Sequence, residues 1–253
     1  MTIQKEEELA KLKKIGAIVA LTIAEMQKKA EPGMTTLELD EIGAAILARE
    51  GARSAPRLVY DFPGATCISV NEEAAHGIPG ARVLQAGDIV NVDVSAEKDG
   101  FFADAGRSFV LHPVEEKYEK LCVYTENALN QAIAASRAKK PFHVIGRAVE
   151  RVAKEGGFRV IRNLGGHGVG RALHESPKFI PAYFEPSDRR RFWKGLVLTI
   201  EPFFSFHVDE VTEGDDGWTL KGPAGSRFAQ YEHTIVITDK KPIILTSAPV
   251  LSS

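Results

Sequence analysis

Cysteine is scarce in this chain, since only Cys67 and Cys122 occur among its 253 residues. Two cysteines are too few for the disulfide framework of a small secreted protein, and this usage is typical of the reducing cytosol. A bond between these two cysteines is the open alternative. Long apolar runs are also missing: no stretch approaches the roughly 20 residues that a membrane-spanning helix needs, and the N-terminal segment lacks the apolar core of a signal peptide. We therefore expect a soluble cytoplasmic protein that does not contact membranes.

An excess of charge of either sign is absent as well. Lys and Arg number 32 against 34 for Asp and Glu, which gives a formal net charge of -2. Proteins that bind nucleic acid through its phosphates usually carry a basic excess, so nucleic acid is not an expected partner. The length allows one large domain or two small ones, with a substantial core in either case. The function must therefore be sought in a local site.

The chain contains two segments that resemble each other. Residues 87–93 (GDIVNVD) and 195–201 (GLVLTIE) each begin with glycine, continue as an apolar strand and end on a carboxylate. Each half then continues to a second strand with an acid, at Asp104 in FADAGRSFV and at Glu232 in AQYEHTIVI. Chance is the alternative, because glycine before a strand and an acid after it are both common. The pattern predicts two helix-helix-strand-strand halves with four acids at related positions.

The helices of each half are predicted from their apolar spacing and their ends. Thr35 and Glu38 form a capping-box pattern that begins a helix, and Gly51 ends it. In the second half, Gly156 and Gly157 end another helix. A further amphipathic helix is predicted at the N-terminus, since apolar residues recur there every three to four positions. The apolar positions of these helices are Leu9, Leu12, Ile15, Val19, Ile23 and Met26, then Leu39, Ile42 and Ile46, then Ile145, Val149 and Val152.

The first two acids are expected to lie on one face of a hairpin. Asp99-Gly100 is a strong two-residue turn signal between the strands around Asp93 and Asp104. With that turn as the centre, Ser95 lies opposite Asp104, and Asp93 is its diagonal neighbour on the same face. Two ionised carboxylates this close repel each other unless one is protonated or a cation lies between them, and a hard divalent metal ion fits oxygen ligands well.

An arbitrary pair of aspartates in a hairpin more often lies on its solvated face. The residues around this pair weaken that alternative, because Val92, Val94, Phe101, Phe102 and Phe109 make the hairpin strongly apolar. We therefore expect the hairpin to be covered and the acids to be partly buried.

The second half supplies ligands of the same kind. Glu201 ends an apolar run and precedes Pro202, which cannot continue a strand ladder. Glu232 lies in a strand among apolar neighbours, and His167 lies in the glycine-rich segment LGGHGVG, where the backbone can bend tightly around one imidazole. Taken singly, a buried glutamate would usually be paired with Arg or Lys.

Among the remaining histidines, His76 and His174 are the candidates for a site. His76 precedes Gly-Ile-Pro and His174 precedes an acid, but spacing alone cannot bring either residue near the carboxylates. The other histidines have charged, loop or strand-flank surroundings that are typical of surface or packing positions; they are His112, His143, His207 and His233.

The motifs together resemble those of the type I methionine aminopeptidases, in the short bacterial form, over nearly the whole chain. The motifs are CISVNEEAAHGIPG, GDIVNVDVSAEKDGFFADAGRSF, NLGGHGVGRALHE, LTIEPF and AQYEHTIVIT. Any one of them is modest support, whereas their joint occurrence in this order is specific. Only 26 residues separate His174 from Glu201, so the helical insertion of the type II enzymes is missing.

The resemblance implies a pita-bread fold, an α/β (α+β) arrangement of pseudo-twofold related halves around an antiparallel sheet, with residues 1–253 as one catalytic domain. It also implies two divalent metal ions, Co, Mn, Fe or Zn. Asp104 and Glu232 would bridge both ions, with Asp93 completing one site and His167 and Glu201 the other. His76 and His174 would contact the substrate without binding metal. With the metals granted, Glu201 is the expected general base.

The function implied is removal of N-terminal methionine from nascent proteins and peptides whose second residue is small. The resemblance favours a monomer, and transient ribosome association is left open. Two alternatives remain. The first is an Xaa-Pro aminopeptidase or dipeptidase of the same fold, but Trp218 and Cys67 are more typical of the methionine enzymes. The second alternative, a non-catalytic peptide-binding module, predicts eroded metal ligands, and all five ligands are present.

Some positions depart from the familiar pattern near the presumed methionine pocket. The segment 58–63 reads LVYDFP where many relatives place Tyr near Pro, so Val59 and Phe62 are departures. Leu173 stands where Phe is familiar, and Ser95 where Thr is frequent. The outline of the pocket is therefore less strongly predicted than the metal ligands.

Overall fold

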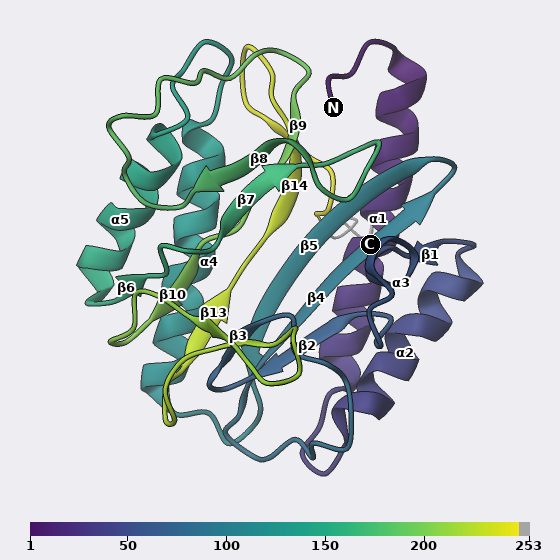
Figure 1. The fold of residues 1–253 in the computed structure, drawn as a ribbon, viewed down its shortest axis with the longest axis vertical. Coiled ribbons are helices and arrows are strands. Elements are labelled where there is room, and N and C mark those ends of the chain that lie inside the picture. Colours follow the sequence, from purple (N-terminus) through teal and green to yellow (C-terminus); the bar gives the residue numbers. More distant parts are fainter. Residues whose placement is uncertain (248–253) are drawn as a thin grey trace, which may run out of the picture.

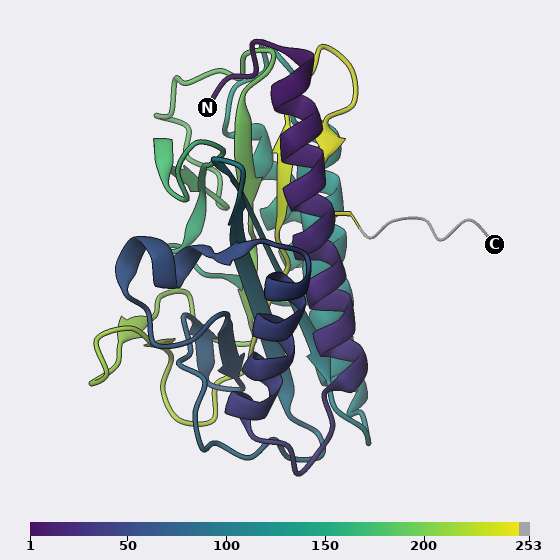
Figure 2. The ribbon, with the colours of Figure 1, turned by 90° about the vertical axis from the view of Figure 1, so that its right-hand side faces the viewer.

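The computed structural model describes residues 1–247, with two pairs of long helices flanking a set of central strands (Figure 1). The first pair is α1 (Glu6–Lys29) and α2 (Thr36–Arg49), and the second is α4 (Glu116–Ala135) and α5 (Val144–Gly156). A short helix, α3 (Ala55–Tyr60), stands apart from them. Figure 2 shows α1 and α4 along one face of the strands, whereas α3 projects from the opposite face.

The strands pair in an antiparallel manner, as expected for this fold class. The first half contains a sheet of β1 (Arg53–Ser54), β4 (Ile89–Lys98) and β2 (Cys67–Val70), with β5 (Phe101–Val110) also paired with β4. The second half contains a five-stranded sheet in the order β15 (Ile243–Ile244), β14 (His233–Val236), β9 (Val197–Ile200), β7 (Gly165–Gly168) and β8 (Glu175–Pro181).

Two smaller antiparallel sheets complete the arrangement. One has the order β13 (Phe228–Gln230), β10 (Phe203–Ser205) and β6 (Arg159–Val160). The other has the order β11 (Thr212–Glu213), β12 (Leu220–Lys221) and β3 (Glu73–Ala75), and it joins a segment of the first half to the second.

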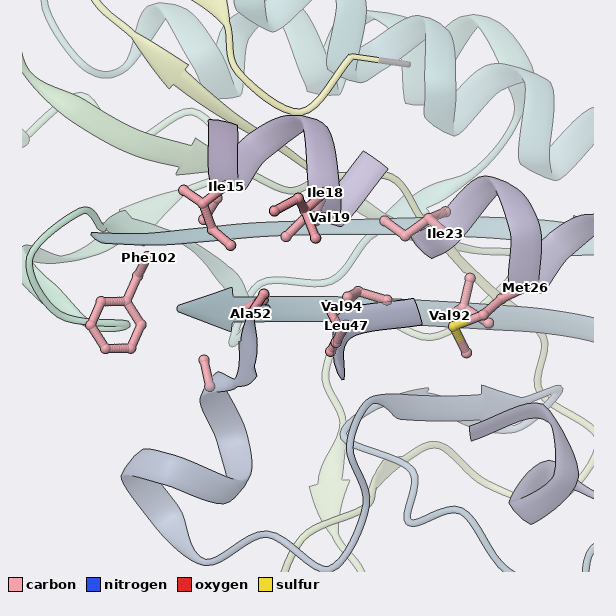
Figure 3. Close-up of a cluster of buried hydrophobic side chains, with 14 of the residues drawn as sticks. Ile15, Ile18, Val19, Ile23, Met26, Leu47, Ala52, Val92, Val94 and Phe102 are labelled. Atoms are coloured by element: carbon pink, nitrogen blue, oxygen red, sulfur yellow. The ribbon is translucent and has the colours of Figure 1, made fainter. Parts of the chain in front are cut away.

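Helix α1 packs the first half together, as its apolar spacing predicted. Figure 3 shows Ile15, Val19 and Met26 of this helix facing Val92 and Val94 of β4. All five side chains are fully buried, so the helix excludes water from one face of the hairpin. The capping box at Thr35 and Glu38 is confirmed at the start of α2.

The second half has its own apolar cluster, built on α4 and α5. Ile145, Val149 and Val152 are buried in the same cluster as apolar residues of α4, against which α5 packs, and this confirms the predicted apolar face of α5. Gly157 takes a left-handed conformation with φ of 78° at the C-terminus of this helix, as its glycine signal predicted.

The internal repeat is visible in the backbone. Gly87 and Gly195, which begin the two similar segments, have φ of 86° and 82°. Both glycines therefore use a left-handed turn to enter a buried strand, β4 in one half and β9 in the other. The shared conformation argues against chance as the source of the sequence similarity.

The β4–β5 hairpin has the predicted register. Asp99 and Gly100 both have positive φ, at 54° and 79°, which is the backbone of a tight two-residue turn. Ser95 pairs with Asp104, and Asp93 pairs with Gly106, so the two acids are diagonal neighbours.

The strand expected around Glu232 differs from the prediction. The segment is divided into β13 and β14, and Glu232 lies in the break between them. Strand β13 pairs with β10, whereas β14 pairs with β9, so the chain changes partners at this point. The backbone N–H of Glu232 donates to the carbonyl of Gly106 instead, at 2.8 Å. The break thereby ties the second half to the hairpin of the first.

The structure bears on the two cysteines and on the expected lack of a membrane-spanning helix. Cys67 and Cys122 are both free thiols, so the alternative of a bond between them is wrong. Within residues 1–247, no helix is long and apolar enough to cross a membrane.

Asp40 fastens the segment after α3 to α2, and its removal is expected to destabilise the fold. Its buried carboxylate accepts hydrogen bonds from Ala65 N and from Thr66 N and Oγ1, at 2.7–2.9 Å. Asp40→Ala leaves these donors unpaired, so the free energy of unfolding should fall by about 3 kcal/mol in urea denaturation. Glu41→Ala, on the exposed side of the same helix, is the control. Equal stability of the two variants would contradict this role.

Candidate metal centre

All seven residues predicted from the sequence line one cavity of about 420 Å³. The cavity lies on the face from which α3 projects, since Pro56 and Tyr60 of that helix form part of its wall. The structure places there Asp93, Asp104, His167, Glu201 and Glu232, together with His76 and His174. The fold therefore brings these side chains together, although their spacing in the sequence could not predict that they lie close to one another.

The four acids come from equivalent places in the two halves. Asp93 and Asp104 lie on neighbouring strands of the hairpin, Glu201 follows the last residue of β9, and Glu232 lies between β13 and β14. Asp104 and Glu232 are 7% and 2% exposed, and one oxygen of each, Oδ1 and Oε1, has no hydrogen-bond partner among residues 1–247. A buried carboxylate oxygen without a donor is strongly disfavoured. These two oxygens therefore point to a cation as their partner.

The acids also disfavour one another's ionisation. Burial raises the pKa of Asp93 to about 6, although hydrogen bonds from Asp104 and Gln230 limit the rise. Burial and the charge of Asp93 raise the pKa values of Asp104 and Glu201, and burial and the charge of Asp104 raise that of Glu232. Four carboxylates in this setting cannot all be ionised unless positive charge is added.

His167 offers an imidazole nitrogen to the same place. Its Nδ1 lies 3.1 Å from the carbonyl of Gly168, and a carbonyl can only accept, so Nδ1 carries the proton. Burial, with repulsion from His174, lowers the pKa of His167 to about 3, which keeps the ring neutral. Its Nε2 lone pair then faces Asp104 Oδ2 at 3.7 Å and Glu201 Oε1 at 3.8 Å.

The donor set fits a metal ion. Ligand atoms of Asp104, His167 and Glu232 lie within 4.8 Å of one another, and all three residues are buried. Carboxylate oxygens with one neutral imidazole suit divalent Mn, Fe, Co or Zn. The partnerless oxygens, the raised carboxyl pKa values and the free Nε2 lone pair are all accounted for by a cation at this position.

The two remaining histidines lie beside this cluster. His76 has φ of 55°, and the following Gly77 approaches the backbone of Ile68 so closely that a side chain there would overlap it. Burial lowers the pKa of His76. Burial also lowers the pKa of His174, to about 4, with added repulsion from His76 and Lys178. The His174 ring lies 4.0 Å from the His167 ring between centroids. Both histidines are therefore neutral near pH 7 and can act as hydrogen-bond donors.

One end of the cavity is apolar. Phe62 and Trp218 meet edge to face with ring centroids 5.1 Å apart, and Cys67 and Leu173 also line the cavity. Phe62 and Leu173 are each 3% exposed. Burial and the nearby Asp93 raise the pKa of the Cys67 thiol well above its usual value, so this side chain remains neutral and apolar in character.

Comparison with known proteins decides the family. The sequence model of metallopeptidase family M24 matches residues 10–239, most of the chain. The chain belongs to metallopeptidase family M24. It is 53% identical to methionine aminopeptidase 2 of Bacillus subtilis over 97% of this chain and 99% of that protein. It is 43% identical to a methionine aminopeptidase of Staphylococcus epidermidis, over 97% and 98% of the two chains.

Two solved structures of other proteins agree with the fold. The methionine aminopeptidase of Thermotoga maritima superposes with a TM-score of 0.93 at 36% identity, over 98% of this chain and all of that chain. Prolidase from Pyrococcus furiosus gives a TM-score of 0.77 at 21% identity, with 66% of its chain covered, which shows the shared fold alone. The family resemblance and the pita-bread fold expected from the sequence are thereby confirmed.

Sequence reasoning missed the residue that holds the M24 acids in place, Gln230. Its side-chain Nε2 donates to Asp93 Oδ2 and to Glu232 Oε2, both at 3.2 Å. Its Oε1 accepts from Asn91 Nδ2 at 2.8 Å. The available signal was its place two residues before Glu232, which puts both side chains on one side of an extended segment.

Gly106 makes room for this amide. A Cβ at position 106 would overlap Gln230 Oε1, so a side chain there would displace this amide from its place between the acids. Thr199 supports the other side of the centre: its Oγ1 accepts from His167 N at 3.1 Å and donates to Glu201 Oε1 at 3.2 Å. Uncharged side chains of the second half thus orient ligands from both halves, and Asn91 of the first half orients Gln230 in turn.

Gln230→Ala is expected to loosen the metal centre of this M24 protein without unfolding it. The change removes the shared donor between Asp93 and Glu232, and loss of such a supporting group typically lowers metal affinity about 10–100-fold. Competition between the protein and a fluorescent chelator measures this affinity. Gln131→Ala, at an exposed amide on α4, is the control. Metal affinity equal to that of the unmodified protein would show that Gln230 does not orient the acids.

Proposed function

We propose that this chain removes methionine from the N-termini of new proteins and peptides whose second residue is small. One observation supports this proposal most directly. A single cavity is lined both by the four acids with His167 and by the apolar rings of Phe62 and Trp218. The first feature suits hydrolysis, and the second suits an unbranched apolar side chain. The named methionine aminopeptidases of Bacillus subtilis and Staphylococcus epidermidis support this assignment.

Two divalent ions are proposed as cofactors, Co, Mn, Fe or Zn. Asp104 and Glu232, with their partnerless oxygens, would bridge the two ions. Asp93 would complete one site, and His167 with Glu201 the other. Such ions, when bound, lower the pKa of water and polarise a carbonyl group, which provides a nucleophile near neutral pH.

The protein's own groups would move protons and hold the peptide. Glu201, which is 12% exposed and partly open to the cavity, would accept a proton from the attacking water and pass it to the leaving amine. His76 would bond the scissile amide nitrogen, and His174 would donate to the carbonyl oxygen as negative charge develops there. Both rings are neutral at pH 7, so they can donate without adding charge to the site.

Residues 1–253 are proposed to act as one catalytic domain in the cytoplasm, as a monomer. A balanced charge of -2 supports a role without nucleic acid as a partner, and no membrane partner is proposed. Methionine is exposed on nascent chains as they leave the ribosome, so transient association with the ribosome would place the enzyme near its substrates.

Removal of metal is expected to abolish peptidase activity. Chelation should stop hydrolysis of Met-Ala peptides, and Mn, Fe or Co should restore it. Asp104→Asn should lose both activity and metal, as measured by elemental analysis, because it removes a charge shared by two ions. Asp99→Asn, in the turn of the same hairpin, is the control, since Asn tolerates its positive φ. Full activity of a metal-free sample would refute the metal-dependent reaction.

Specificity should follow the shape of the cavity. Missing methylenes in an apolar pocket are worth about 1–3 kcal/mol each, so norleucine should replace methionine well, whereas Leu or Ala should lower kcat/KM by about ten- to several hundred-fold. Peptides beginning Met-Ala, Met-Gly or Met-Ser should be cleaved well, and those beginning Met-Lys, Met-Leu or Met-Phe poorly. The measurement is kcat/KM over peptides varied at both positions, with Xaa-Pro peptides included. Equal rates for Leu-first peptides, or preference for Xaa-Pro, would overturn the methionine assignment.

A further inference from the structure

Tyr60 is bonded to a histidine of the site from a distant part of the chain. Its hydroxyl lies 2.7 Å from Nδ1 of His174, and the two rings are 5.7 Å apart between centroids. Both residues line the cavity. The contact joins α3 of the first half to the segment that leads into β8 of the second half.

The local sequence fixes where this hydroxyl lies. Helix α3 begins at the Ser54 cap, whose Oγ accepts from Arg57 N, and ends at Asp61, which has φ of 55°. Tyr60 is the last helical residue, and the left-handed turn directs the chain so that Phe62 enters the buried apolar wall. Tyr60 is 43% exposed and lies at the edge of the cavity. The phenol is thus placed by a helix end rather than by its own burial.

The hydrogen bond constrains which ring nitrogen of His174 carries the proton. Burial raises the pKa of Tyr60, so its hydroxyl is protonated and can donate. A neutral imidazole has one donor and one acceptor nitrogen, and a phenol hydroxyl is a better donor than acceptor, so this contact favours Nδ1 as the acceptor. With Nδ1 accepting from the phenol, the proton lies on Nε2, which is the nitrogen left for the substrate. The opposite tautomer would present a lone pair to the carbonyl oxygen and repel it.

We propose that Tyr60 is a positioning residue for His174: its hydroxyl donates to Nδ1 and holds the ring as the Nε2–H tautomer that donates to the reacting carbonyl. This inference rests on the proposed function of the site. The neighbouring His167 ring, 4.0 Å away, limits rotation of His174, so orientation and tautomer are set by separate contacts. Tyr60 itself touches neither the acids nor the reacting atoms in this scheme.

The kinetic test separates the hydroxyl from the ring. Tyr60→Phe keeps the aromatic wall and removes only the donor, so kcat should fall about 10–100-fold while KM and metal content stay unchanged. Tyr60→Ala should raise KM in addition, because the ring also bounds the cavity. Tyr124→Phe, which removes a hydroxyl on α4 away from the cavity, is the matched control and should retain full activity. Unchanged kcat in Tyr60→Phe would overturn the proposal.

A spectroscopic test does not depend on turnover. In protein labelled with ¹⁵N-histidine, the shifts and long-range couplings of the two ring nitrogens distinguish the tautomers, and the His174→Gln spectrum assigns the signal. The measurement is made on both the metal-free and the zinc-loaded protein. We expect Nε2–H in the unmodified protein and a mixture of tautomers in Tyr60→Phe. Nδ1–H in the unmodified protein, or the same spectrum in both, would refute the role of Tyr60.

The two tests also separate this inference from the proposed function. If the unmodified protein fails to cleave Met-Ala peptides but shows the Nε2–H signal and its loss in Tyr60→Phe, the contact is correct and the activity assignment is wrong. If the unmodified protein cleaves these peptides and Tyr60→Phe matches it in kcat and spectrum, the activity is correct and the positioning role is wrong.

Discussion

Repulsion among four carboxylates is the constraint on which the rest of the site depends. Burial raises the pKa values of Asp93, Asp104, Glu201 and Glu232, and the charge of a neighbouring acid adds to the rise at the last three. The fold opposes this repulsion only in part, through the amide of Gln230 and the hydroxyl of Thr199. Because a cation would complete the balance and displace protons from these groups, metal binding and protonation are opposing equilibria at one centre.

The acids of the site follow the internal repeat, whereas its histidines do not. Each half contributes one acid after a glycine and an apolar run and a second acid from its next extended segment, so the carboxylates follow the internal repeat. The histidines do not obey it: His167 and His174 come from the second half, and His76 comes from the first. The repeated part of the structure therefore supplies the carboxylates, and the histidines are the unrepeated part of the site.

Local rules in the sequence were sufficient for much of the fold and for part of the site. The turn at Asp99 and Gly100 determined the hairpin register, and register alone placed Asp93 and Asp104 on one face. The helix ends at Thr35 and Gly157 followed from capping chemistry in the same way. These features depend on neighbours within a few residues, and for that reason composition and spacing could predict them.

The features that sequence reasoning missed depend on contacts between distant segments. The strand break at Glu232 arises because β13 and β14 pair with different partners, and nothing in AQYEHTIVI signals that exchange. Tyr60 and His174 meet only after α3 and β8 have packed across the cavity. Gln230 resembles an ordinary strand residue in the sequence, and only the fold places its amide between two acids.

The packing of Gly106 against Gln230 has an evolutionary consequence. A methyl group at position 106 would occupy the space of the amide oxygen, and a shorter residue at position 230 would free that space but leave Asp93 and Glu232 without their shared donor. Neither position can drift alone without loss at the other. In relatives that keep the four acids, positions 106 and 230 should therefore change together. The paired replacements should restore a hydrogen-bond donor between the two carboxylates.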